Sequence, residues 1–122
     1  MTETKTLFEI TPQEAWELFQ AGQAIIIDVR EPSEYAVERI RGALLSPIAT
    51  LNPTALPDGK GGKRIIFHCA SGARSARAAA LYLDAGRQEA THIKGGIIAW
   101  KQAGLPFVGV DPATGGIKDK NV

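Results

Sequence analysis

Two short apolar runs limit the folds open to this chain more than any other feature of its sequence. AIIIDV at residues 24–29 and RIIFHC at residues 64–69 contain several consecutive apolar residues, without alternating polar ones. Such runs are typical of strands that are buried on both faces of a parallel sheet. Because segments with helical periodicity follow both runs, the sequence predicts an α/β fold in which helices cover both faces of a mostly parallel sheet.

Shorter segments complete this alternation of strands and helices. Further strands are predicted at residues 7–10, 42–48 and 90–93, and helices at residues 11–22, 31–40, 73–86 and 95–106. In the helix predicted at 73–86, Ala76, Ala80 and Leu83 recur at helical spacing, which predicts that they form its buried face. Residues 52–63 are rich in Pro and Gly and are predicted to form a surface loop.

The chain is predicted to form one domain over residues 1–110, followed by a mobile tail over residues 111–122 that lacks apolar periodicity. A formal net charge of +1 gives no global field that would attract nucleic acid or an anionic membrane. The N-terminus does not resemble a secretory signal, and no apolar run reaches the roughly 20 residues of a membrane span. We therefore expect neither nucleic acid nor membrane as a partner.

Cys69 is the only cysteine, which excludes an internal disulfide and a cysteine-rich zinc site. A reducing cytoplasm is the expected setting, and neither a metal nor another cofactor is expected. A solitary cysteine at a strand end is usually a small buried hydrophobe. Here, however, it lies between a buried strand and a helix, at the sheet edge where ligands of parallel sheets bind.

The residues after Cys69 are suited to surround an anion. Small side chains let the backbone curl with its N–H groups inward, and Gly72 can adopt a positive φ. A free cysteine has a pKa of about 8.5, and a helix N-terminus lowers this pKa because it stabilises the thiolate. Arg74 adds positive charge, and Ser75 is expected to cap the helix. The candidate site consists of Cys69 as nucleophile and of Ala70, Ser71, Gly72, Ala73, Arg74, Ser75 and Arg30 as binding residues.

Three segments of the chain resemble rhodanese-type sulfurtransferases. CASGARS at residues 69–75 is similar to the active-site loop of that family, Cys-x-x-Gly-x-Arg-Ser. IIDVREPSEYAVERIRGALLSPI at residues 26–48 and GGIIAWKQAGLPF at residues 95–107 resemble two further family motifs in the same order. The resemblance implies a single rhodanese-like domain of three α/β/α layers, with a central, mostly parallel five-stranded sheet.

The resemblance also implies a chemistry. The Cys69 thiolate would take the outer sulfur of a small anionic donor such as thiosulfate and carry it as a persulfide, held by the N–H groups of residues 70–75. Cyanide or a thiol, or a sulfur-relay protein, would then accept that sulfur in a second step, which is covalent ping-pong catalysis.

Two other functions stay open. The chain is alternatively a non-catalytic or partner-dependent rhodanese-like module that carries sulfur or binds a protein. A cysteine phosphatase is opposed by loop length, since such enzymes place five residues between Cys and Arg, and this chain places four between Cys69 and Arg74. One residue contributes about 3.8 Å of Cα path, so the shorter ring favours a single sulfur atom over a phosphoryl group.

Several residues near these motifs have less certain roles from sequence. Arg30 is placed to guide an anionic donor or, equally, to brace the loop through a salt bridge. Asp28 is placed to pair with a loop arginine or to cap a turn. His68 should point away from the face of Cys69 and is read, like His92, as structural. The family often has histidine and proline where this chain has Arg39 and Arg41. These two departures change the surface around Arg39 and Arg41 and leave the loop at Cys69 unchanged.

Overall fold

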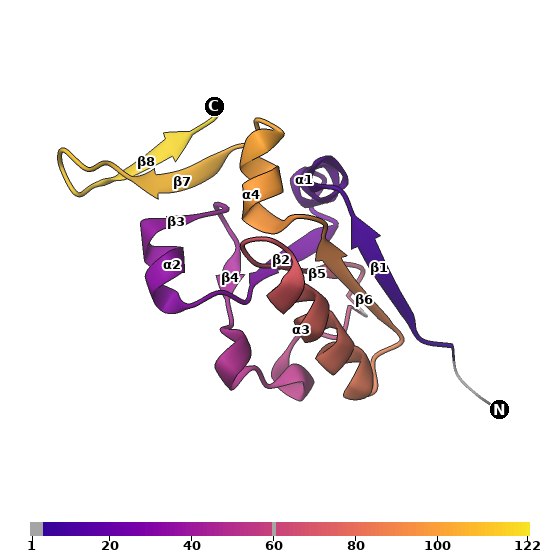
Figure 1. The fold of residues 1–122 in the computed structure, drawn as a ribbon. Helices are drawn as coiled ribbons and strands as arrows, with labels where there is room; N and C mark the ends of the chain where they lie inside the picture. Colours follow the sequence, from indigo (N-terminus) through magenta and orange to yellow (C-terminus); the bar gives the residue numbers. More distant parts are fainter. Residues whose placement is uncertain (1–3, 60) are drawn as a thin grey trace.

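The computed structural model describes residues 4–59 and 61–122, so residues 1–3 and Lys60 of the predicted surface loop lie outside it. Its centre is a sheet of five parallel strands in the order β1-β6-β5-β2-β4 (Figure 1). The strands are β1 (Thr6–Ile10), β2 (Ala24–Asp28), β4 (Leu44–Leu45), β5 (Arg64–His68) and β6 (Glu89–Ile93). The two apolar runs form β2 and β5 and lie side by side in the middle, which confirms the predicted parallel α/β architecture.

Helices cover both faces of this sheet. On one face lie α1 (Pro12–Gln20) and α4 (Gly96–Gln102), and on the other lie α3 (Ala73–Asp84) and the short 3₁₀ turns η1 (Ile48–Thr50) and η2 (Pro53–Ala55) (Figure 1). The helix α2 (Pro32–Val37) follows the carboxyl end of β2. Alternate residues of the same strands serve the two cores, so a continuous apolar run fits a strand between two helical layers.

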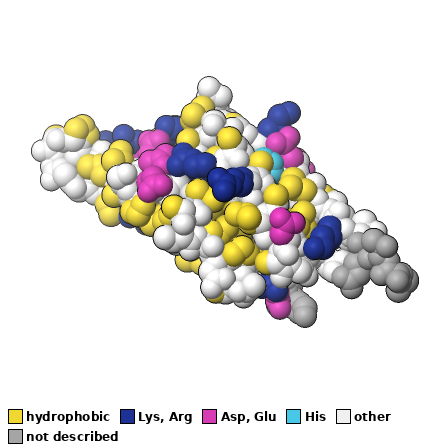
Figure 2. Space-filling model, turned by 60° about the horizontal axis from the view of Figure 1, so that its bottom comes forward, with side chains coloured by type: hydrophobic (Ala, Val, Ile, Leu, Met, Phe, Trp, Pro, Cys, Tyr) yellow, Lys and Arg dark blue, Asp and Glu magenta, His cyan; other side chains and the backbone are white. Residues whose placement is uncertain are grey.

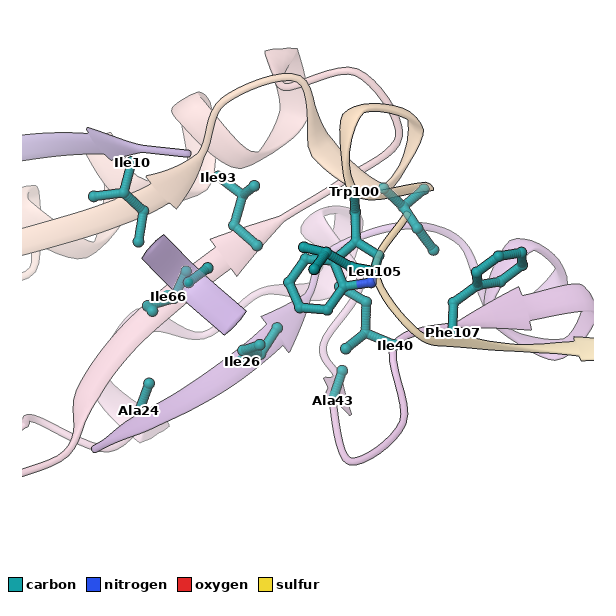
Figure 3. Packing of buried hydrophobic residues seen from close by; sticks show 12 residues of the cluster. Ile10, Ala24, Ile26, Ile40, Ala43, Ile66, Ile93, Trp100, Leu105 and Phe107 are labelled. Carbon is teal, nitrogen blue, oxygen red and sulfur yellow. The ribbon is translucent and has the colours of Figure 1, made fainter. Parts of the chain in front are cut away.

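The core beneath α1 and α4 is centred on the fully buried ring of Trp100. In Figure 3 this ring lies among aliphatic side chains from the sheet and from the segments that flank it. Trp100 also meets Trp16 edge to face, with ring centroids 5.8 Å apart, and its Nε1 donates a hydrogen bond of 2.7 Å to the carbonyl of Pro106. The indole N–H is thus hydrogen-bonded and the apolar part of the ring is packed, and these contacts together hold α4 against the sheet.

The buried face of α3 differs from the predicted one. The structure buries Ser75, Ala78, Ala79 and Tyr82. Of the residues predicted to be buried, Ala80 is exposed, and Ala76 and Leu83 are partly buried. These four buried positions follow the i, i+3, i+4, i+7 spacing of one helix face. An alanine-rich helix offers apolar residues on nearly every side, so periodicity could not select the face. The actual face is the one that places a polar residue, Ser75, against the sheet.

The predicted mobile tail at residues 111–122 is also corrected, because it contains a strand. A second, antiparallel sheet in the order β3-β7-β8 consists of β3 (Glu38–Arg39), β7 (Phe107–Val110) and β8 (Ile117–Lys120). In Figure 1 this sheet extends away from the central one, beside α2 and α4. Only its middle strand, β7, contributes residues to the buried core.

β8 is held by polar contacts, and this explains why the apolar pattern did not reveal it. Its backbone pairs with β7, and Arg41 forms an ion pair of 2.6 Å with Asp119 of β8. The amide of Asn121 donates hydrogen bonds to the carbonyls of Lys101 and Leu105. Arg41, one of the two departures from the family pattern, thus contacts the second sheet.

The charged side chains on the surface are mixed in sign. On the face that Figure 2 shows, acidic and basic side chains lie next to one another, with hydrophobic ones between them. Within the described ranges, no helix is both long enough and apolar enough to cross a bilayer.

Candidate active site

Cys69 lies in the loop that joins the carboxyl end of β5 to the first turn of α3. The N-cap of α3 is Gly72, whose φ of +114° is accessible to glycine and strained for other residues, as the sequence predicted. Ser75 is not the cap that the sequence predicted, because it lies inside the first turn of the helix. Its hydroxyl instead donates a hydrogen bond of 3.1 Å to the carbonyl of Gly72.

The thiol of Cys69 faces the backbone amides of this loop. The N–H of Gly72 donates to Sγ at 3.0 Å and the N–H of Ser75 at 3.3 Å, and Ser75 Oγ lies 3.6 Å from Sγ. Cys69 is only 1% exposed and belongs to the apolar cluster between the sheet and α3. A buried sulfur with amide donors on one side is arranged to hold negative charge.

Two opposing effects set the acidity of this thiol. Burial raises the pKa of Cys69, since a charge is less stable away from water. The Ser75 hydroxyl and the backbone N–H groups of Ser75, Gly72 and Ser71 lower it through hydrogen bonds, and together they prevail. The pKa of Cys69 therefore lies below its ordinary value, so this thiol ionises more readily than that of a free cysteine.

Helix α4 fixes the other side of the same loop. The N–H of Ile97 donates to the carbonyl of Cys69 at 2.8 Å, and the N–H of Ile98 donates to the carbonyl of Ala70 at 3.1 Å. This approach requires Gly96, because a Cβ at that position would lie 2.6 Å from the carbonyl carbon of Ala70 and would also meet the carbonyl oxygen of Cys69. The loop carbonyls are thus bound to α4, whereas N–H groups of the loop point at the sulfur.

Arg74 begins on the same loop, but its guanidinium is paired with α2. Its Nη1 and Nη2 lie 2.6 Å and 3.0 Å from the two carboxylate oxygens of Glu34. Glu34 raises the pKa of Arg74, burial acts in the opposite direction, and the charge on Cys69 adds a smaller increase. The Arg74 hydrogen bonds in turn lower the pKa of Glu34 to about 2. Arg74 is therefore a fixed charge that joins α2 to the loop.

This ion pair gives a test by pH. Because the pKa of Glu34 falls from 4.5 to about 2 on folding, the stabilisation is present above about pH 4.5 and is lost as the pH falls towards 2. The pair is one-third exposed, so Glu34→Gln is expected to lower the free energy of unfolding by only about 0.5–1 kcal/mol at pH 7. Urea unfolding at pH 7 and pH 3 would measure this. A difference between the two chains that grows towards pH 3 would contradict the assignment.

Arg30, Asp28 and His68 form a buried group beside the loop. Arg30 Nη2 lies 2.7 Å from Asp28 Oδ2 and donates to the carbonyl of Glu38 at 2.7 Å. His68 Nδ1 is 3.3 Å from the carbonyl of Cys69, and its Nε2 is 3.4 Å from Asp28 Oδ2. Burial is the main cause that lowers the pKa of His68. Asp28 thus pairs with Arg30, one of the arrangements that the sequence left open, and the donor-binding role of Arg30 stays a prediction.

A cavity of about 460 Å³ lies where this group meets the loop. Its lining includes Arg30, Ala70 and Ile97, together with the exposed side chains of Val37 and Ile98. The predicted binding residues Arg30 and Ala70 therefore line one cavity. Within residues 4–59 and 61–122, no group of three or more His, Cys, Asp or Glu side chains is placed to hold a metal ion.

His92 is the residue whose place at the site the sequence did not predict. Its Nδ1 lies 3.0 Å from Ser75 Oγ, and its Nε2 lies 3.2 Å from Glu9 Oε2. Glu9 and His92 are directly opposite each other in the parallel pair of β1 and β6. Burial lowers the pKa of His92 and the carboxylate of Glu9 opposes this effect. A polar chain thus runs from the thiol to the surface.

Comparisons with known proteins agree with this geometry. Residues 11–103 match the family described as rhodanese-like domain. An uncharacterized protein of Synechocystis is 41% identical over 105 residues, which are 86% of this chain and 58% of that protein. Thiosulfate sulfurtransferase GlpE of Haemophilus influenzae is 34% identical over 81% of this chain and 92% of its own length. A crystal structure of a rhodanese-related protein from Thermoplasma volcanium is similar with a TM-score of 0.72 at 28% identity, over 83% of this chain and 97% of that one.

Proposed function

The chain belongs to the rhodanese-like domain family, and from this premise we propose that it is a sulfurtransferase with Cys69 as sulfur carrier. The observation that supports this most is the contact of Sγ with the N–H groups of Gly72 and Ser75, at 3.0 Å and 3.3 Å. An ionised sulfur at the base of a ring of amides is the nucleophile that this reaction requires.

The proposed reaction has two displacements. In the first, the Cys69 thiolate attacks the outer sulfur of thiosulfate, the sulfur–sulfur bond of the donor breaks, and sulfite leaves with the electron pair. In the second, cyanide or a thiolate attacks the terminal sulfur of the Cys69 persulfide, and Cys69 leaves as the thiolate. The N–H groups of residues 70–75 bind the transferred sulfur, and Arg30, which lines the cavity beside Ala70, contributes to binding of the anionic donor.

The size of the ring favours sulfur over a phosphoryl group. Four residues, Ala70 to Ala73, separate Cys69 from Arg74, and Sγ already accepts hydrogen bonds from both Gly72 and Ser75. A ring this short is suited to one added sulfur atom. A phosphoryl group would need donors for three peripheral oxygens.

The first experiment is intact-mass spectrometry of the reduced protein after exposure to thiosulfate. We expect a mass increase of one sulfur atom, which disappears on addition of cyanide as thiocyanate forms. Glutathione persulfide, mercaptopyruvate and a cysteine-desulfurase persulfide, offered in parallel, would rank the donors. No added sulfur from any of these donors would contradict the proposal.

A partner-dependent carrier is the second candidate, and the surface near the loop favours it. Val37 is 60% exposed and Ile98 46%, and both line the cavity next to Ala70. Exposed apolar side chains at a reactive loop are suited to dock a protein acceptor. Sulfur uptake from a protein persulfide that is much faster than from thiosulfate, and that falls when Ile98 is replaced by serine, would favour this candidate. In either case the thiol must stay reduced, so we propose a cytoplasmic setting.

A further inference from the structure

We propose that Ser75, His92 and Glu9 form a proton relay that ionises Cys69. The inference deepens the proposed function and rests on it, since only a reactive Cys69 gives the relay a task. Ser75 contacts the thiol directly, whereas His92 and Glu9 are positioning residues, because they act on the thiol through Ser75.

Three separate elements bring the relay together. Ser75 projects from the buried face of α3, and Sγ lies 3.6 Å from its Oγ. His92 on β6 places Nδ1 3.0 Å from the same Oγ, and Glu9 on β1 places Oε2 3.2 Å from the far nitrogen, Nε2. The strand register that pairs Glu9 with His92 puts both side chains on the α3 face of the sheet. Cys69, Ser75 and His92 are buried and Glu9 is about half exposed, so the chain ends at water.

The hydrogen-bonding capacities of these groups define the direction of the relay. The carboxylate of Glu9 only accepts, so Nε2 of His92 is the nitrogen that carries hydrogen. In the neutral ring Nδ1 is then an acceptor, and the Ser75 hydroxyl can donate to it. Ser75 Oγ in turn has a lone pair for the S–H of Cys69.

Ionisation then moves one proton without any exchange with solvent. The S–H proton passes to Ser75 Oγ as the Ser75 proton passes to His92 Nδ1. The result is a thiolate that accepts a hydrogen bond from Ser75, and an imidazolium that donates to Ser75 at one end and to Glu9 at the other. The carbonyl of Gly72, 3.1 Å from Ser75 Oγ, competes for the same hydroxyl, and protonated His92 directs the hydroxyl to the sulfur instead.

The charges around His92 suit this task. Glu9 from β1 is the charged group that raises the pKa of His92, and burial lowers it more strongly. From α3 the Ser75 hydroxyl contacts the ring and connects it to the Cys69 thiol, and the residue opposite His92 on β5 is the apolar Phe67. His92 is therefore neutral at rest and gains a proton when the thiolate forms beside it.

Alkylation of Cys69 by iodoacetamide as a function of pH tests the relay without any sulfur donor. His92→Asn keeps an acceptor near Ser75 but removes the base, so the alkylation midpoint is expected to rise by about one pH unit, with roughly tenfold slower alkylation at pH 7. Ser75→Ala should shift the midpoint at least as far, and the double variant no further than Ser75→Ala. Glu9→Gln should shift it less, and the matched control Glu89→Gln, an exposed carboxylate on β6, should leave it unchanged.

A midpoint that stays at the wild-type value in His92→Asn, whereas Ser75→Ala shifts it, would overturn the relay. If His92→Asn does not fold, ¹⁵N NMR of the histidines in the wild-type chain decides. Capping Cys69 removes the thiolate, so His92 should then protonate at lower pH, and an unchanged titration would contradict the relay. Wild-type protein that takes up no sulfur but shows the expected shifts would refute only the proposed function, and sulfur uptake without the shifts would refute only the relay.

Discussion

Replacing Cys69 with serine is expected to abolish both sulfur uptake from thiosulfate and sulfur transfer to cyanide, leaving only the uncatalysed background. The hydroxyl can still accept hydrogen bonds from Gly72 and Ser75, at the positions where Sγ accepts them now. The amide ring and the helix start are thus retained, and only the polarisable, ionisable atom is lost. A serine hydroxyl is much harder to ionise than a thiol, and it cannot carry sulfur as a persulfide.

Intact mass and thiocyanate formation measure this loss, and thermal unfolding of Cys69→Ser provides the control for folding. A variant that unfolds near the wild-type temperature and yet carries no sulfur assigns the carrier to Cys69. Sulfur bound by Cys69→Ser at the wild-type level would show that another group carries it.

The second large effect is expected for Gly96→Ala, a change that does not touch the thiol. Gly96 has φ of +60°, and an added Cβ would lie 2.6 Å from the backbone of Ala70. Backbone cannot rotate away as a side chain can, so either α4 withdraws or the loop opens. Strain and overlap together are expected to reduce the free energy of unfolding by about 3 kcal/mol or more, and to remove most sulfur transfer.

Gly22→Ala is the matched control for this substitution. Gly22 has φ of +71° and nothing within 4 Å of the added Cβ, so it carries the backbone strain without the overlap. We expect a loss of about 1 kcal/mol and normal transfer. Urea unfolding of both variants and transfer rates under folding conditions would separate the two effects. Equal losses of stability in both variants would mean that the contact of Gly96 with the loop is unimportant.

The central sheet and the cysteine loop could be predicted because their signals are local. β2 and β5 are continuous apolar runs, and Cys69 to Ser75 are neighbours in the sequence, so spacing alone describes the ring. The positive φ of Gly72 follows from the same loop. In these cases the residues that determine the structure are also those that are adjacent in the chain.

The remaining features depend on contacts between distant segments. β8 is exposed and is held by backbone pairing and by the ion pair of Asp119 with Arg41. Its sequence therefore shows no apolar periodicity from which a strand could be predicted. His92 lacks neighbours of catalytic type in the sequence, and it meets Glu9 only through the register of β1 and β6. Ser75 faces it only because α3 is turned to a face that its alanines do not specify.

The hydrogen bonds that α4 donates to the carbonyls of Cys69 and Ala70 have a consequence for enzyme redesign. Converting this scaffold into a phosphatase would require a longer ring, and both anchored carbonyls precede Ser71. A residue inserted after Ala70 could therefore lengthen the ring towards α3 while the hydrogen bonds from Ile97 and Ile98 stay in place. A graft that aims at a larger oxyanion would therefore keep α4 as it is, and libraries should vary the segment between Ala70 and Arg74.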